Sequence, residues 1–147
     1  MVNKVILLVE DNPDDEELVL RSLRRANIAN DVVVMHDGME ALEFLFGANG
    51  GPACDSARMP ALVLLDLKMP RVGGIEVLQR IRLEHATRYM PVVILTSSSE
   101  DEDIVRSYEQ GANSYVRKPV DFTEFANVVQ RLGLYWLLTN QVPRSME

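Results

Sequence analysis

The sequence has a single cysteine, fewer basic than acidic residues and no long hydrophobic run, and each shortage excludes a class of protein. A single cysteine, Cys54, cannot form an internal disulfide, and no histidine lies near it in the sequence as a catalytic partner. The net charge of -7 argues against a nucleic-acid surface, which needs clustered lysine and arginine. The apolar runs are too short to cross a bilayer, and acidic residues follow the first of them at once, unlike a signal peptide. The sequence therefore predicts a cytoplasmic protein that binds neither nucleic acid nor membrane.

The composition is otherwise that of an ordinary globular domain. The 147 residues are 47% hydrophobic and 25% charged, close to the averages for soluble proteins, and the chain is long enough to bury a core without disulfides. No internal repeat and no low-complexity linker divides the sequence. We expect one domain over residues 1–140, followed by a polar tail over residues 141–147.

Five short apolar segments alternate with helical patterns along this domain. The apolar segments cover residues 4–9, 31–36, 62–66, 91–96 and 114–117. Pro13 suits the first turn of a helix, and a capping residue followed three positions later by glutamate marks helix starts at Asp37, Ser99 and Asp121. The fifth helical pattern continues through Trp136. Strands that alternate with helices through short connections predict an α/β fold, a doubly wound parallel sheet of five strands with five helices.

The third apolar segment ends on a single carboxylate, Asp66. Residues 62–65 carry no polar side chain, which is typical of a strand buried on both faces of a parallel sheet. Such strands deliver reacting groups at their carboxyl ends, so Asp66 is a candidate reactive residue. The alternative is that Asp66 only caps the turn into the next helix, and this stretch alone leaves both interpretations open.

Polar residues stand at the ends of four predicted strands, and these ends meet at one edge of such a sheet. They are Glu10 and Asp11 after the first strand, Asp66 after the third, Thr96 at the end of the fourth and Lys118 after the fifth. Three clustered carboxylates repel one another unless their pKa values rise or a divalent cation binds, and an all-oxygen site suits Mg2+. Three carboxylates, one Mg2+ and one lysine nearly balance in charge, so the site could accept a phosphoryl group.

These residues and their spacing closely resemble the receiver domain of two-component response regulators, a CheY-like family. Thr96 lies thirty residues after Asp66, Lys118 lies twenty-two after Thr96, and Tyr115 stands three residues before the lysine, at the aromatic switch position of the family. The resemblance spans residues 2–138 and implies the flavodoxin-like strand order 2-1-3-4-5.

The resemblance implies that Asp66 accepts a phosphoryl group from a phosphohistidine on a sensor histidine kinase. The protein would catalyse only its own phosphorylation and dephosphorylation, and is otherwise not an enzyme. By the same resemblance, the Thr96 hydroxyl and the Lys118 ammonium would bind the phosphoryl oxygens. The cofactor would be Mg2+, with Mn2+ as a substitute, and its ligands would be Glu10, Asp11, Asp66 and the backbone carbonyl of Lys68.

Further family features fall on named positions of this chain. On phosphorylation Thr96 would move toward the phosphoryl group and Tyr115 would turn inward, which changes the face formed by the fourth helix, fifth strand and fifth helix. The Lys118–Pro119 bond would be cis. Lys68 and Ser98, two residues after the acceptor and after the threonine, would tune attack by water, and Lys68 favours a long-lived phosphoryl group. Glu10, where many members have aspartate, could reach the metal through a water.

The output of the chain would be protein binding or phosphorelay, because too few residues follow the fifth helix for an effector domain. The segment 134–138 is apolar around the whole helix, so it either docks a partner or closes its own core. If exposed, it favours a homodimer through the fourth helix, fifth strand and fifth helix. Candidate interface residues are Tyr108, Leu134, Tyr135 and Trp136. The amino-acid sequences of four segments, 9–15, 36–42, 114–120 and 134–138, also resemble those of stand-alone regulators of bacterial phytochrome histidine kinases.

Two other classes share parts of this pattern. A flavodoxin-like electron carrier needs a phosphate-binding loop rich in Ser, Thr and Gly after the first strand, where this chain has acidic residues that would repel a phosphate. A haloacid-dehalogenase-type phosphatase would want a second aspartate at position 68, where this chain has Lys68. Both departures favour the response regulator interpretation.

Overall fold

The computed structural model describes residues 5–28, 30–47, 59–98, 100–118, 122–139 and 141–143. Five parallel strands form one sheet in the order β2-β1-β3-β4-β5, as predicted. The strands are β1 (Val5–Val9), β2 (Asp31–Met35), β3 (Pro60–Leu65), β4 (Val92–Thr96) and β5 (Ser114–Arg117). The helices are α1 (Pro13–Arg25), α2 (Gly38–Phe46), α3 (Gly74–Leu83), α4 (Asp101–Glu109) and α5 (Phe122–Gly133), followed by a π-helical segment, Leu134–Thr139. Among the described helices, none combines the length and apolar character that a membrane crossing requires.

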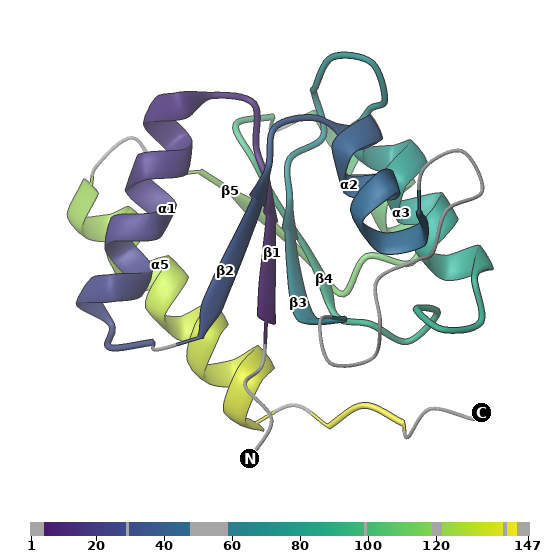
Figure 1. The fold of residues 1–147 in the computed structure, drawn as a ribbon. Helices are drawn as coiled ribbons and strands as arrows, with labels where there is room; N and C mark the ends of the chain where they lie inside the picture. Colours follow the sequence, from purple (N-terminus) through teal and green to yellow (C-terminus); the bar gives the residue numbers. More distant parts are fainter. Residues whose placement is uncertain are drawn as a thin grey trace.

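Helices cover both faces of the sheet, with α1 and α5 on one side and α2 and α3 on the other (Figure 1). The central strands alternate accordingly: Leu64 of β3 packs toward α1 and α5, while Val63 and Leu65 pack toward α2 and α3. Every residue of β1 and β4 is buried. The unbroken apolar runs of the sequence therefore exist because each of these strands supplies side chains to two cores.

The ladder of the sheet continues beyond the strand ends and places the polar residues that follow them. The backbone N–H of Glu10 donates to the carbonyl of Met35, and the N–H of Asp66 donates to the carbonyl of Val9. At the other side of the sheet, the N–H of Lys118 donates to the carbonyl of Thr96. Glu10, Asp66 and Lys118 are thus held at one sheet edge by backbone hydrogen bonds.

Side chains cap the starts of α1 and α2, and the helix starts differ from the predicted capping boxes in two respects. Pro13 begins α1, and the Asn12 side chain caps it by accepting from the next two free N–H groups. Asp37 accepts from the N–H of Glu40, but the Glu40 carboxylate reaches back to the N–H of His36 and not to the cap. The second difference is at α4, whose N-cap position is Glu100. The predicted caps Ser99 and Asp121 lie outside the described residues.

The loop from Asp66 to α3 is tied to α2. The guanidinium of Arg71 binds the Asp37 carboxylate with two hydrogen bonds, of 2.8 and 3.1 Å. This pairing lowers the pKa of Asp37. The N–H of Gly38 donates to the carbonyl of Val72, and the N–H of Gly74 donates to the carbonyl of Leu67. These contacts hold the turn that follows Asp66 in one conformation.

The fifth helix does not continue as a regular α-helix through Trp136, as the sequence pattern predicted. It ends at Gly133, and the backbone then winds as a π-helix. A Cβ atom at Gly133 would collide with the Ile28 side chain, so the helix packs closely against the turn after α1 at this residue. A periodicity argument misses the change of winding, because residues 134–138 are apolar at every position and carry no period that distinguishes the two helices.

Gly74 gives the first prediction. A Cβ atom at Gly74 would collide with the backbone carbonyl oxygen of Asp66, whereas a Cβ atom at Gly73 would lie 3.4 Å from the carbonyl oxygen of Leu67, in ordinary contact. The Gly74→Ala variant should therefore lose about 1–3 kcal/mol of unfolding free energy, because α3 must move off the backbone of Asp66. Gly73→Ala is the matched control at the N-cap position, where alanine caps less well than glycine but restricts the unfolded chain more, so its loss should stay within about 0.5 kcal/mol. Urea unfolding of both variants checks this, and equal losses would contradict it.

Candidate functional site

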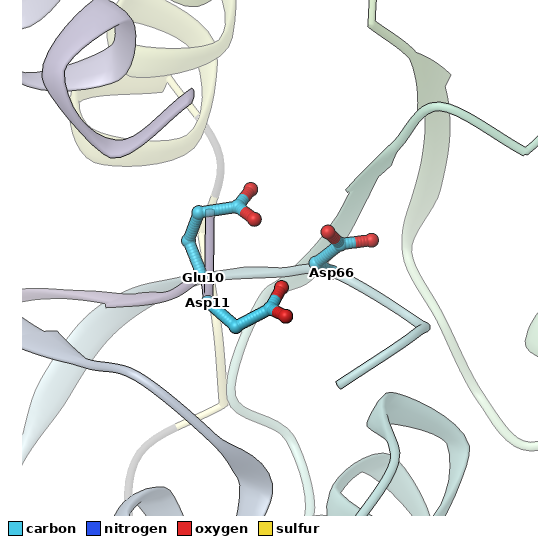
Figure 2. A group of neighbouring side chains, drawn as sticks. All are labelled: Glu10, Asp11 and Asp66. Atoms are coloured by element: carbon cyan, nitrogen blue, oxygen red, sulfur yellow. The ribbon is translucent and has the colours of Figure 1, made fainter. Parts of the chain in front are cut away.

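Three carboxylates gather at the carboxyl edge of the sheet. Oxygens of Glu10, Asp11 and Asp66 lie within 4.8 Å of one another, and Figure 2 shows the three side chains as neighbours. Glu10 is 1% and Asp66 9% exposed, whereas Asp11 is exposed to solvent. The neighbouring strands β1 and β3 bring them together, since Glu10 and Asp11 follow Val9 and Asp66 follows its pairing partner Leu65. This cluster could hold a metal ion, and its oxygen-only ligand set suits a hard cation.

Lys118 reaches into the same cluster from the end of β5. Its ammonium donates to Glu10 Oε1 at 2.5 Å, to Asp15 Oδ2 at 2.8 Å and to Asp66 Oδ2 at 3.3 Å. Only 6% of the lysine side chain is exposed. An ammonium has three N–H donors, and here each of them meets a carboxylate.

Burial and mutual repulsion govern the protonation of this cluster. Burial raises the pKa of Glu10 to about 7 from its ordinary 4.5, and the charge of Asp66 adds to the rise, while the hydrogen bond from Lys118 opposes it. For Lys118, burial opposes the charged form, but the hydrogen bonds to Asp15 and Glu10 outweigh burial and raise its pKa. The ammonium is thus firmly charged, and without a cation Glu10 takes up a proton at a higher pH than an ordinary glutamate.

Asp66 does not cap the following helix, so the structure removes the capping alternative for this residue. Gly73 occupies the N-cap position of α3, and no side chain caps that helix. The Asp66 carboxylate instead accepts from the N–H of Leu67 through Oδ1, at 2.7 Å, and from Lys118 through Oδ2. Its two oxygens therefore have different environments: Oδ1 meets a backbone N–H, and Oδ2 faces the Lys118 ammonium.

The other predicted residues of the site form a second connected group beside the first. Thr96 is buried, and its Oγ1 accepts from the N–H of Ser98 at 3.4 Å. The Tyr115 hydroxyl donates to the carbonyl of Ser98 at 2.8 Å, and Ser98 Oγ donates to Asp103 of α4 at 2.7 Å. Backbone and side chain of Ser98 thus join the end of β4 to β5 and to α4.

Lys68 has an exposed side chain just beyond Asp66. The predicted cis bond falls on Pro119, which lies outside the described residues. Residues 48–58, which include Cys54, also lie outside them. Metal ligation by the Lys68 carbonyl stays a prediction.

The proposed interface residues do not behave alike. Tyr108 on α4 is 51% exposed and Tyr135 is 50% exposed. Trp136 is half-buried and packs against the core between the sheet, α1 and α5, and it meets the Tyr135 ring edge-on. Leu137 is buried in that core, while the side chains of Leu134 and Leu138 lie outside the description. Part of the apolar segment therefore closes its own core, and Tyr135 projects from it.

Asp15 is the site residue that the sequence argument missed. It follows Asp14 in the first turn of α1, and both acidic residues suit the helix N-terminus equally well. The helix directs Asp15 toward Lys118, while Asp14 is exposed. Helical spacing from Asp11 offers no signal, because α1 begins at Pro13 and Asp11 precedes the N-cap Asn12.

The pKa of Glu10 gives the second prediction. Because the native state holds a proton on Glu10 that the unfolded state has lost, the unfolding free energy of the metal-free protein falls as the pH rises from about 4.5 through about 7. The Glu10→Gln variant cannot titrate at this position, so its stability should depend less on pH. Urea unfolding at pH 5 and pH 8 measures the difference, with exposed Glu109→Gln as the control. An unchanged pH dependence in Glu10→Gln would contradict the account.

Known proteins match nearly the whole chain. It is 38% identical over 139 residues to the probable methanogenesis regulatory protein FilR2 of Methanothrix harundinacea, covering 95% of this chain and 87% of the relative. It is 37% identical over 142 residues to the response regulator Rcp1 of Synechocystis sp., covering 97% of this chain and 95% of Rcp1.

Solved structures agree with these relatives. The phosphorylated cyanobacterial phytochrome response regulator RcpA superposes with a TM-score of 0.82 at 34% identity, covering 96% of this chain and 99% of RcpA. The Mn2+-bound form of Rcp1 gives 0.81 at 35% identity, with 95% and 99% covered. The bacteriophytochrome response regulator AtBRR is 48% identical with a TM-score of 0.68, again covering 95% and 99%. A model of the response regulator receiver domain matches residues 6–130. The chain belongs to the family of response regulator receiver domains.

Proposed function

We propose that this protein is a stand-alone response regulator that accepts a phosphoryl group on Asp66 from the phosphohistidine of a sensor histidine kinase. The observation that carries the proposal is the environment of Asp66 Oδ2. This oxygen lies 3.3 Å from the Lys118 ammonium, at the end of a buried strand and beside two further carboxylates. A cation on one side and a cation-binding cluster on the other suit a place where the negative charge of an arriving phosphoryl group must be neutralised.

In the proposed reaction, Asp66 Oδ2 attacks phosphorus and forms an O–P bond. The N–P bond of the phosphohistidine breaks, and its electron pair returns to the imidazole of the kinase. Lys118 supplies a fixed positive charge near the transferring oxygens, and buried Thr96 supplies a hydroxyl at the neighbouring strand end. The chain contributes mainly position and charge, because phosphoryl transfer demands little covalent chemistry from the protein.

The residues present fit a divalent cation. Glu10, Asp11 and Asp66 would hold it, with the Lys68 carbonyl as a further proposed ligand and Glu10 acting directly or through a water. When bound, Mg2+ would neutralise charge that develops on the phosphoryl oxygens. Rcp1 has been solved in a Mn2+-bound form, which supports an oxygen-ligated divalent ion at the corresponding place and Mn2+ as a substitute.

The readout of phosphorylation would pass through Ser98. If Thr96 moves toward the phosphoryl group, its contact with the Ser98 N–H changes, and Ser98 also holds the Tyr115 hydroxyl and Asp103. The change would thus reach β5 and α4 together. Ser98 and the exposed Lys68 also stand where they would tune the attack of water on the phosphorylated aspartate, with Lys68 favouring a long lifetime.

The proposed partners are a histidine kinase of the phytochrome type and a second copy of the chain. RcpA is described as a phytochrome response regulator and AtBRR as a bacteriophytochrome response regulator, which supports the phytochrome-type kinase. The homodimer would use α4, β5 and α5, where the exposed ring of Tyr108 offers an apolar contact.

Phosphorylation is the third prediction. Incubation of the native protein with acetyl phosphate and Mg2+ should add the mass of one phosphoryl group, measured on the intact chain. The Asp66→Asn variant lacks the nucleophilic oxygen and should gain none. The Asp101→Asn variant, which changes an exposed carboxylate on α4, is the control and should be labelled like the native protein. Equal labelling of Asp66→Asn and the native protein would sink the proposal.

Dimerisation is the fourth prediction. Tyr108→Glu places a charge on the proposed α4–β5–α5 surface and should shift the equilibrium toward the monomer, because a buried unpaired charge is costly. Tyr89→Glu is the matched control, since Tyr89 is 52% exposed and lies outside that surface. Light scattering over a concentration series measures the average mass. The surface assignment fails if both variants change the mass equally.

A further inference from the structure

Lys118 is held more closely by a helix residue than by the proposed phosphoryl acceptor. Its Nζ lies 2.8 Å from Asp15 Oδ2 and 3.3 Å from Asp66 Oδ2. Asp15 belongs neither to the carboxylate cluster of the strand ends nor to the β4–α4 group around Ser98. It is also the most accessible of the three carboxylates around the lysine, with 30% of its side chain exposed against 2% for Glu10 and 11% for Asp66.

Asp15 also gives the site a surplus of negative charge. The three carboxylates of Glu10, Asp11 and Asp66 are balanced by one divalent cation together with Lys118. The Asp15 carboxylate is a fourth, for which the described site holds no further cation. A phosphoryl group on Asp66 would increase the negative charge again, at short range from Asp15.

We infer that Asp15 is a positioning residue that restrains phosphorylation, because it competes with the phosphoryl group for the Lys118 ammonium. This inference rests on the proposed function. All three N–H donors of Lys118 are engaged by carboxylates. The contact with Asp66 Oδ2 is given up when that oxygen bonds phosphorus, but Glu10 and Asp15 still hold the ammonium and oppose its full turn toward the phosphoryl oxygens. Asp15 is the carboxylate that can turn to water at the lowest cost, since it is partly exposed while Glu10 and Asp66 are buried.

The restraint acts on the difference between two states. The Asp15–Lys118 pair stabilises the unphosphorylated protein, and its loss on phosphorylation reduces the net gain from the new lysine–phosphoryl contact. A purely structural role would differ, because the pair would then anchor α1 to the end of β5 in both states. Removal of Asp15 would in that case lower stability without any gain in affinity for a phosphoryl mimic.

The test is the affinity for beryllofluoride, a phosphoryl mimic, at saturating Mg2+. The Asp15→Asn variant should bind it at least threefold more tightly than the native protein, as measured from the bound fluorine-19 signal in a titration. Asp14→Asn is the matched control, since it removes the same charge from an exposed position in the same helical turn and should leave affinity unchanged. Asp15→Glu restores the carboxylate and should return the affinity toward the native value.

The outcomes separate this inference from the proposed function. Labelling of the native protein by acetyl phosphate reports on the proposed function alone, and its absence in every variant would overturn both. With labelling present, equal beryllofluoride affinity in Asp15→Asn and Asp14→Asn overturns the inference only. Weaker binding by Asp15→Asn also overturns it, and urea unfolding of the same variants identifies the structural role in that case.

Discussion

The meeting of one ammonium with three carboxylates at the carboxyl edge of the sheet is the interaction on which the site depends. Lys118 comes from the end of β5, Glu10 from β1, Asp66 from β3 and Asp15 from α1, so four separate parts of the chain converge on one charge. Burial disfavours the charged forms of Glu10 and Lys118 in this place. Glu10 resists ionisation there, and Lys118 stays charged only because acidic oxygens surround it.

The fold makes this convergence possible. Parallel strands buried on both faces bring their carboxyl ends to one edge, and backbone hydrogen bonds continue from the ladder to Glu10, Asp66 and Lys118. On the next layer, Gly74 lets α3 lie against the Asp66 backbone, and Arg71 ties the intervening loop to Asp37.

Much of this arrangement could be predicted from the sequence, and the failures have identifiable physical causes. Buried strands leave unbroken apolar runs, so the strands, the sheet and the polar residues at its edge could all be predicted. The role of Asp15 could not, because Asp14 and Asp15 are equally favourable in the first turn of a helix. Only the rotation of α1 against the sheet distinguishes them. The π-helical segment after Gly133 was missed because residues 134–138 are apolar at every position, so no hydrophobic period distinguishes a π-helix from an α-helix there. The alternative interpretation, in which Asp66 only caps the next helix, is excluded because Gly73 occupies the N-cap position of α3.

The most direct measurement of the central claim is the chemical identification of the phosphorylated residue. Borohydride reduces an acyl phosphate of aspartate to homoserine, and peptide mass spectrometry after phosphorylation in the presence of Mg2+ locates that product. The account predicts homoserine at position 66 and at no other aspartate, including the neighbouring Asp11 and Asp15. Homoserine at another position, or a phosphoryl group that survives reduction on a histidine or serine, would contradict it.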